Sequence, residues 1–396
     1  MHNLPQQVIR GWRPVLAAAC LLLVVSCQAT KTGTGEALVW PDPPEEPRYI
    51  YDKMIRSSAD VVEETKAERF QRMATGVGIA GKGFDKPWGV AAFDGRVYIG
   101  DTLSRKIHYY DLAAKTYSEF GNRGPGSLAK PLQVAVDGKG KVYVCDGTGR
   151  RVVIFSQDGE FLGAVGTANE LERPSAVAVN ADGTRVYVVD TGGVKSEKHH
   201  VVVFNQDGEK IQTIGSRGTE EGQFNLPVSA AVAPNGNLYV VDGGNFRVQA
   251  FDPTGKFLFT FGTVGRRSGQ FARPKDITVD REGNVYVTDS AFGNFQIFDP
   301  QGKLLLFIGK RGDSGAPAEY MLPAGIAVDQ KDGRVYVVDQ FLKKLDIYRP
   351  PTTPAERPPR PVTKGSKGGK DAKHGKDAKA VQESEGVPQG VTFEVK

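Results

Sequence analysis

One pattern recurs six times along the sequence, and this repeat limits the possible fold more than any other feature. Each copy opens with a proline followed by small and β-branched residues. The copies start at spacings of 44, 43, 53, 47 and 49 residues, at Pro87, Pro131, Pro174, Pro227, Pro274 and Pro323. Repeats of this length, each too small to bury a hydrophobic face alone, are typical of stacked or ring-shaped architectures.

Each repeat contains the signals of several short strands. A turn dipeptide such as Asp94-Gly95 or Asn235-Gly236 follows the opening strand, and a Val-Tyr-Val strand then ends in aspartate. A third strand ends in an aromatic residue, and in five repeats a second turn leads to a fourth strand that closes in glycine. Four short antiparallel strands in 40 to 50 residues predict one propeller blade, so the chain is predicted to be an all-β, six-bladed β-propeller.

The sixth repeat lacks its fourth strand, because Pro350-Pro351 cannot continue a ladder. The β-rich segment Arg48-Tyr49-Ile50-Tyr51 has no blade of its own. We therefore predict that it pairs with the last blade and closes the ring, that the propeller spans residues 48–350, and that deletion of everything before residue 60 unravels it.

These motifs resemble the NHL repeat. The resemblance rests on the Pro-x-x-Val opening, the Val-Tyr-Val-x-Asp strand, and the Arg-Val-x-x-Phe strand at Arg151 to Phe155 and Arg247 to Phe251. It covers about 300 of the 396 residues. It implies the propeller fold but no single function, because NHL propellers include protein-binding, RNA-binding and ligand-sensing surfaces, and related rings include lactonases and lyases.

The first 26 residues are predicted to be a signal peptide. Arg10 and Arg13 precede an apolar run from Val15 to Val25, which is too short to span a bilayer. The following Ser26-Cys27 resembles a bacterial lipoprotein signal, which implies lipidation at Cys27 and, from Gln28, outer-membrane retention in a Gram-negative host. The alternative is an ordinary signal peptide with an incidental cysteine. Either way the protein is expected to be exported, and the first interpretation makes it a membrane-anchored lipoprotein of the cell envelope.

The segments on both sides of the ring look like linkers. Residues 27–47 are rich in Gly and Pro and predict an extended spacer. Residues 351–396 are rich in Pro, then in Lys and Gly, and are predicted to be disordered, either as a solvated tail or as a tail that docks on anionic polymers. Cys145 is the one cysteine of the repeat region, so no disulfide framework is expected, and its strand predicts a buried small hydrophobe.

Six aspartates end the second strand of each repeat. A carboxylate just before a turn can accept backbone N–H bonds, so we interpret them as structural. They are Asp101, Asp146, Asp190, Asp242, Asp289 and Asp339.

Basic residues recur in the loops that join one repeat to the next. Propeller geometry places these loops on one face, where arginine forks suit carboxylate or phosphate groups. They are Arg123, Arg217, Arg266, Arg267, Lys310 and Arg311. The alternative is that Gly-x-Arg-Gly is a soluble turn that recurs with the repeat. Export argues against nucleic acid as the partner.

The third repeat carries an insertion. Asp190 and Phe204 lie fourteen residues apart where the other repeats have nine, and the extra residues include Lys195, His199 and His200. Insertions in repeat proteins often mark the binding side. Adjacent histidines on a strand point to opposite faces, so no metal is predicted, and the insertion is either a partner-contact loop or neutral.

The second residue after each opening proline samples the ring axis: Gly89, Gln133, Ala176, Ser229, Asp276 and Gly325. One carboxylate falls short of a calcium centre, and the few histidines (His108, His199 and His200) fall short of a zinc centre. No cofactor or catalytic residue is therefore predicted. We predict a non-catalytic binding scaffold or sensor for an envelope protein or an anionic ligand. The alternative is a lactonase-like or amidating-lyase-like enzyme acting at the channel around Asp276, Gln133 and Ser229. The oligomeric state stays open.

Overall fold

The computed structural model of the protein describes residues 37–78, 81–353 and 356. All of them lie in one compact unit that ends at residue 358. The predicted signal peptide, Cys27 and almost all of the predicted tail lie outside the described residues.

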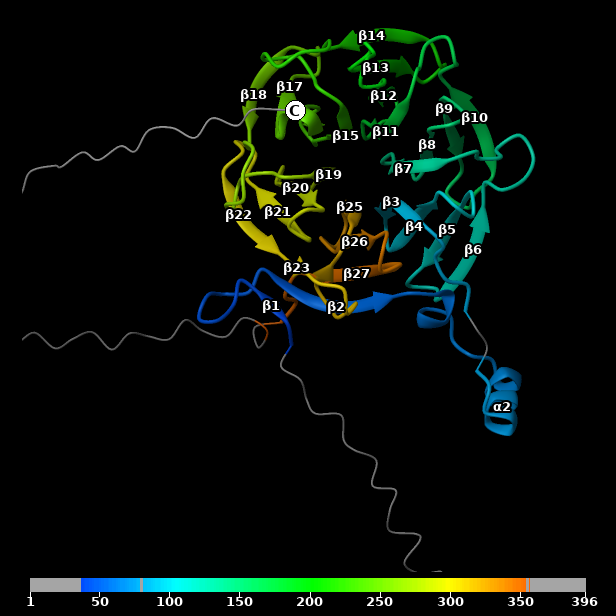
Figure 1. Cartoon of the computed structure of the whole chain (residues 1–396). Coiled ribbons are helices and arrows are strands. Elements are labelled where there is room, and N and C mark those ends of the chain that lie inside the picture. Colours follow the sequence, from blue (N-terminus) through cyan, green and yellow to red (C-terminus); the bar gives the residue numbers. More distant parts are fainter. Residues whose placement is uncertain (1–36, 79–80, 354–355, 357–396) are drawn as a thin grey trace, which may run out of the picture. The chain divides into compact units, whose positions relative to one another are not determined.

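Six four-stranded antiparallel sheets surround a central axis, as the repeat predicts (Figure 1). Blade 1 contains β3 (Pro87–Phe93), β4 (Arg96–Asp101), β5 (Lys106–Asp111) and β6 (Thr116–Phe120). Blade 2 contains β7 (Pro131–Val136), β8 (Val142–Asp146), β9 (Arg151–Phe155) and β10 (Phe161–Val165). Blade 3 contains β11 (Pro174–Val179), β12 (Arg185–Asp190), β13 (His200–Asn205) and β14 (Lys210–Ile214). Blade 4 contains β15 (Pro227–Val232), β16 (Leu238–Asp242), β17 (Arg247–Phe251) and β18 (Phe257–Phe261). Blade 5 contains β19 (Pro274–Val279), β20 (Val285–Asp289), β21 (Asn294–Phe298) and β22 (Leu304–Ile308).

Blade 6 is assembled from both ends of the chain. It contains β25 (Pro323–Val328), β26 (Val335–Asp339), β27 (Lys344–Arg349) and β2 (Tyr49–Ile55), and β1 (Val39–Trp40) extends its outer edge. Strand β2 pairs antiparallel with β27 from Ile50 opposite Arg349 to Ile55 opposite Leu345. The predicted closure is confirmed, and the closing strand is longer than the four residues that the sequence indicated.

The first strand of every blade lies at the axis and the fourth lies at the rim (Figure 1). One face of the ring carries the connections between blades and those between second and third strands, and we call it the loop face. The opposite face carries the tight turns and is called the turn face. The connections of the loop face contain the short elements β23 (Lys310–Arg311), β24 (Glu319–Tyr320) and the 3-10 turn η2 (Gly243–Asn245).

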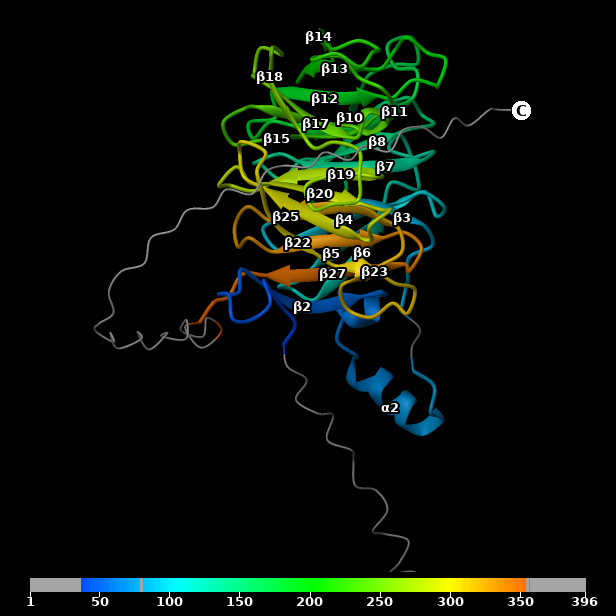
Figure 2. The same ribbon diagram turned by 60° about the vertical axis from the view of Figure 1, so that its left-hand side comes forward.

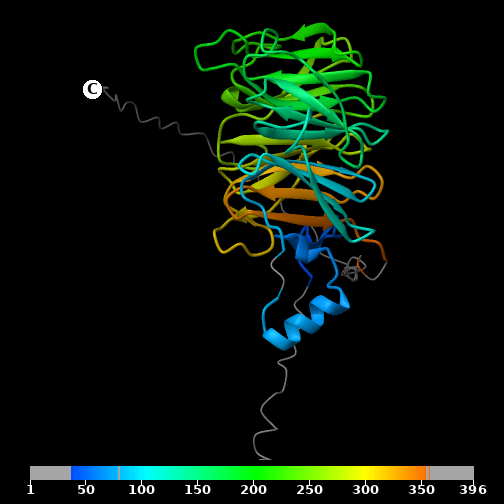
Figure 3. The same cartoon turned by 90° about the vertical axis from the view of Figure 1, so that its right-hand side faces the viewer.

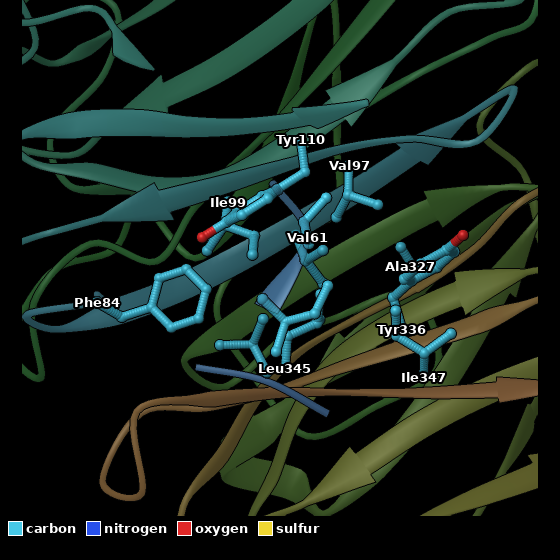
Figure 4. Packing of buried hydrophobic residues seen from close by; sticks show 12 residues of the cluster. Val61, Phe84, Val97, Ile99, Tyr110, Ala327, Tyr336, Leu345 and Ile347 are labelled. Carbon is cyan, nitrogen blue, oxygen red and sulfur yellow. The ribbon is translucent and has the colours of Figure 1, made fainter. Parts of the chain in front are cut away.

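The hydrophobic core is divided into six clusters, one at each junction between neighbouring blades. Alternating β-branched and aromatic residues of the strands supply them, because successive side chains point to opposite sides of a blade. The cluster between blades 6 and 1 also takes Ile55, Val61 and Phe84 from the N-terminal segment (Figure 4). The closing segment therefore supplies core residues as well as a strand.

One helix lies outside the ring. Between β2 and β3 the chain forms the 3-10 turn η1 (Ser58–Asp60) and the helix α2 (Lys66–Thr75), which stands away from the blades in Figures 2 and 3. Within the described residues, no helix has the length and apolar character needed to cross a membrane.

Candidate functional site

The axis of the propeller is closed by a hydrogen-bond cluster around Asp276 of β19. Its carboxylate accepts bonds from Gln133 Nε2 at 2.8 and 3.0 Å and from Ser229 Oγ at 2.6 Å. It also accepts the backbone N–H of Ile277 and of Ile326, each at 2.9 Å. These donors come from blades 2, 4, 5 and 6, so one carboxylate connects four blades across the ring.

The strands around this cluster are closely packed. A Cβ at Gly89 would lie 2.5 Å from Gln133 Oε1, and one at Gly325 would lie 2.5 Å from the Trp88 carbonyl oxygen. Glycine is therefore required where these strands approach each other. Burial raises the pKa of Asp276 to about 6, against the lowering effect of its hydrogen bonds. The structure brings together Asp276, Gln133 and Ser229, as the channel hypothesis required, but their polar groups bind one another.

The six strand-ending aspartates hold the loops of the loop face. All six are fully buried, and each accepts backbone N–H bonds from residues just before the first strand of its own blade. Most also accept N–H groups of the turn that follows them, as Asp339 does from Phe341 at 2.9 Å and Leu342 at 2.8 Å. Each aspartate thereby joins the entry into its blade to the loop after its second strand.

The residue before the opening proline is fixed through its backbone on both sides. In blade 1, Lys86 N–H donates to Asp101 at 2.9 Å, and its carbonyl accepts the N–H of Thr102 at 3.0 Å. The same pair of bonds holds Lys130, Arg173 and Arg273 in blades 2, 3 and 5. The backbone is rigid at these positions, but all four side chains are exposed.

These four residues and Lys275 make up what we call the cationic ring. Each lies within two residues of the start of a first strand, and the first strands surround the axis, so the five residues lie around the end of the axis on the loop face. Across residues 37–78 and 81–353, none of the five side chains forms a salt bridge. Several positive side chains on one face of the ring favour the binding of an anion.

Lys275, the second residue of β19, is partly buried and reaches towards blade 1. Its Nζ is 5.6 Å from the ring centroid of Trp88, which belongs to a blade two positions away. Burial, and then the nearby Arg273, lower the pKa of Lys275. The contact between Lys275 and Trp88 is a cation–π interaction that joins blades 5 and 1.

The arginines predicted from the loops do not form one cluster. Arg123, Arg266, Arg267 and Arg311 are all exposed on the loop face, in the connections after blades 1, 4 and 5. Arg311 donates to the carbonyl of Ser290 at 3.1 Å, and Lys310 pairs with Glu319 at 3.2 Å. Arg123 shares its connection with Lys130, and Arg266 and Arg267 share theirs with Arg273, whereas the connection that contains Arg311 carries no member of the cationic ring.

The insertion of blade 3 is folded against the chain. Arg217 donates to the carbonyls of Val194 and Ser196 at 3.0 and 3.2 Å and pairs with Glu197 at 3.0 Å. Arg217 therefore holds the insertion in place. Val194, Lys195 and Glu197 are its exposed residues.

The two histidines of the insertion have different surroundings. His199 is fully buried, its Nε2 lies 3.0 Å from the Gly193 carbonyl, and its Nδ1 accepts the N–H of Leu226 at 3.2 Å. His200 is partly buried near Asp190, and burial lowers its pKa. His199 therefore has a structural role in the insertion.

The described residues contain no group of three or more His, Cys, Asp or Glu side chains suited to a metal ion. His108 is buried in blade 1, where its Nδ1 lies 2.7 Å from the Tyr117 hydroxyl. Cys145 is a buried free cysteine, and burial raises the pKa of its thiol.

Sequence reasoning missed the cationic ring although a signal for it was present. Lysine or arginine stands directly before the opening proline in four of the six repeats, at Lys86, Lys130, Arg173 and Arg273. The Gly-x-Arg-Gly phrases occur in only three of the connections between blades. The better signal was a position of the repeat that is basic in most of its copies.

The arrangement of strands and closing segment defines the class of protein, a six-bladed β-propeller. A family model described as a 6-bladed beta-propeller matches residues 282–349. The NHL repeat model matches residues 224–251. The chain is therefore a six-bladed β-propeller with NHL repeats.

Solved structures with the same fold have diverse descriptions. A protein of unknown function from Bacteroides thetaiotaomicron has a TM-score of 0.56 at 18% identity, over 77% of this chain and 76% of its own. A gluconolactonase from Xanthomonas campestris has a TM-score of 0.52 at 20% identity, over 76% of this chain and 98% of its own. A virginiamycin B lyase from Staphylococcus aureus has a TM-score of 0.49 at 13% identity, over 67% and 94%. No curated protein sequence matches significantly. The likeness to the first two structures, at 18% and 20% identity, establishes the fold alone.

Proposed function

We propose that the protein is an envelope-tethered binding protein whose loop face captures an anionic ligand, or an acidic segment of an envelope protein, at the cationic ring. The supporting observation is that Lys86, Lys130, Arg173 and Arg273 have fixed backbones and exposed side chains without salt bridges among the described residues. Because the backbone is already fixed at these positions, only the side chains lose conformational freedom when an anion binds. Arginine adds forked donors that match carboxylate and phosphate groups.

This proposal is tested with residues 28–358, which we call the propeller chain. It keeps every described element and omits the lysine-rich tail, which would itself attract anions. Inorganic tripolyphosphate serves as the probe in calorimetric titration. Replacing Lys130, Arg173 and Arg273 by glutamine is expected to weaken binding by about tenfold or more. The reason is that each ion pair between a solvent-exposed side chain and the anion contributes about 0.5–1 kcal/mol.

The matched control removes three cations near the turn face. Lys210, Lys256 and Lys303 are exposed, form no salt bridge among the described residues, and lie at the turns before fourth strands. Their replacement by glutamine causes the same loss of charge, so binding should stay within about twofold if location matters more than net charge. Equal weakening in the two triple variants would refute the cationic ring as the site.

The tether at Cys27 has its own test. We expect full-length protein expressed in a Gram-negative host and extracted from membranes to lack residues 1–26 and to carry acyl chains on Cys27. The supporting observation is the apolar run from Val15 to Val25 followed by Ser26-Cys27. Intact mass spectrometry of the wild type and of Cys27→Ser checks this. A soluble wild-type protein with an unmodified N-terminus would contradict the lipoprotein assignment and leave the binding proposal untouched.

A further inference from the structure

The helix α2 belongs to an excursion whose two ends are fastened to the ring. Ser57 and Gly83 form an antiparallel bridge, and the N–H of Ser58 donates to the Lys82 carbonyl at 2.9 Å. Beyond this base, Val61 and Phe84 are buried between blades 6 and 1. Both ends of this segment are therefore fixed to the ring, and substitutions in α2 are not expected to destabilise the blades.

Sequence signals define both ends of α2, although the helix buries none of its residues against the described part of the chain. Thr65 and Glu68 form a capping box, with Glu68 N–H to Thr65 Oγ1 at 3.2 Å and Thr65 N–H to Glu68 Oε2 at 2.8 Å. Gly76 ends the helix at a φ of 69°. None of its ten residues is buried. Helices this short take most of their stability from packing of an apolar face, so α2 lacks the partner that would stabilise it.

One side of α2 is apolar and bordered by cations. Phe70 is 73% exposed and Met73 is 77% exposed, and their spacing of three residues puts them on the same side of the helix. Lys66 and Arg69 flank them and form no salt bridge among the described residues, whereas Arg72 is paired with Glu64 at 2.8 Å. Val77, just beyond the helix, is 68% exposed. An apolar side bordered by basic residues is the pattern of helices that lie in the membrane interface.

We propose that α2 docks in the plane of an anionic lipid surface, with Phe70 and Met73 inserted among the acyl chains and Lys66 and Arg69 paired with lipid phosphates. A second copy of the chain fits less well, because it would bring the same flanking cations against each other without acidic residues on that side. The chain also brings the helix near a membrane under the proposed tether. The first described residue, Ala37, lies ten positions after Cys27, a reach of at most about 35 Å. The inference concerns a surface other than the cationic ring and does not depend on ligand binding there.

The experiment measures co-flotation of the propeller chain with vesicles of phosphatidylcholine, alone or with a third of phosphatidylglycerol. Binding is expected with the anionic vesicles. The double variant Phe70→Glu and Met73→Glu should lower the bound fraction by about tenfold. The double variant Gln71→Glu and Thr75→Glu adds the same charge on the opposite side and should lower it by less than about threefold. Thermal unfolding should be unchanged in both, because α2 buries nothing.

A second readout locates the helix in the interface. Met73→Cys can be labelled with a polarity-sensitive fluorophore, because Cys145 is buried and the propeller chain has no other cysteine. Its emission should shift to the blue with anionic vesicles and stay constant with phosphatidylcholine alone. Equal loss of binding in the two double variants, no flotation of the unsubstituted chain, or a stable dimer that Phe70→Glu and Met73→Glu dissolves would each overturn the proposal. None of these outcomes bears on tripolyphosphate binding by the cationic ring.

Discussion

Replacing Asp276 with alanine is expected to lower the free energy of unfolding of the propeller chain at pH 7 by about 3 kcal/mol, because buried donors left without an acceptor cost about 1–3 kcal/mol each. The substitution removes the acceptor of Gln133, Ser229 and two backbone N–H groups at the axis. Urea unfolding followed by circular dichroism measures the loss. Ser229→Ala, which removes one of the donors together with its bond, should cost only about 1 kcal/mol. A cost at Asp276 no larger than that at Ser229 would show that water replaces the cluster.

The same carboxyl makes stability depend on pH. Its pKa is about 6 in the folded protein against an ordinary 3.8, because it is buried. Between these values the folded state holds the proton and the unfolded state has lost it. The contribution of Asp276 to stability therefore falls as pH rises from about 4 to 6, by about 3 kcal/mol, and is constant above. The difference in unfolding free energy between the wild type and Asp276→Asn isolates this group, and a difference that grows with pH would contradict the assignment.

Removing the closing strand is expected to abolish cooperative unfolding. A propeller chain that begins at Ser57 lacks β1 and β2, and so loses the pairing partner of β27 and the core residue Ile55. It also loses the bond from the Tyr51 hydroxyl to Asp346, 3.0 Å long, and the bond between the hydroxyls of Tyr49 and Tyr286, 2.6 Å long. An unpaired β27 would be an open edge, and the core clusters on both sides of blade 6 would be exposed.

Truncation at Ala37 provides the control, because it retains every described strand. That chain should unfold like the longer one in a thermal scan, while the chain from Ser57 should show no sharp transition and should be cut rapidly by protease. A synthetic peptide of residues 46–57 added to the shorter chain should restore the transition, whereas the same peptide with Ile55→Asp should not. Cooperative unfolding of the chain from Ser57 without peptide would disprove closure by β2.

The architecture could be predicted from the sequence because the same pattern of strands and turns occurs six times. Strand positions, turns and the missing fourth strand follow from local rules that depend on neighbouring residues. The contacts of Asp276 do not, because its partner Gln133 lies 143 residues away and their meeting depends on the diameter of the ring. The second residue after each proline could be placed near the axis, but the residue types there did not reveal which of them would bind each other.

The same difference between local features and long-range contacts applies to the candidate site. The exposed arginines of the loops could be placed on one face from the repeat, whereas the burial of His199 could not, since it results from the insertion folding back onto Leu226. The helix α2 had local signals that were not used: Thr65 and Glu68 at capping-box spacing and Gly76 after the last turn. Its exposed side could not be foreseen, because whether a helix packs against its own domain is decided by tertiary structure.

Closure of blade 6 by β2 also affects the order in which the protein folds. Tyr51 and Asp346, which meet in that blade, are separated by 295 residues. During synthesis β2 can therefore pair only after β27 has been made. The entropy cost of closing so long a loop arises in this single late step. Blades 1 to 5 can assemble one after another, but no ring exists until the chain is almost complete. A chain threaded through a membrane pore N-terminus first would thus stay open during transit and become a closed ring only after its C-terminal strands have crossed.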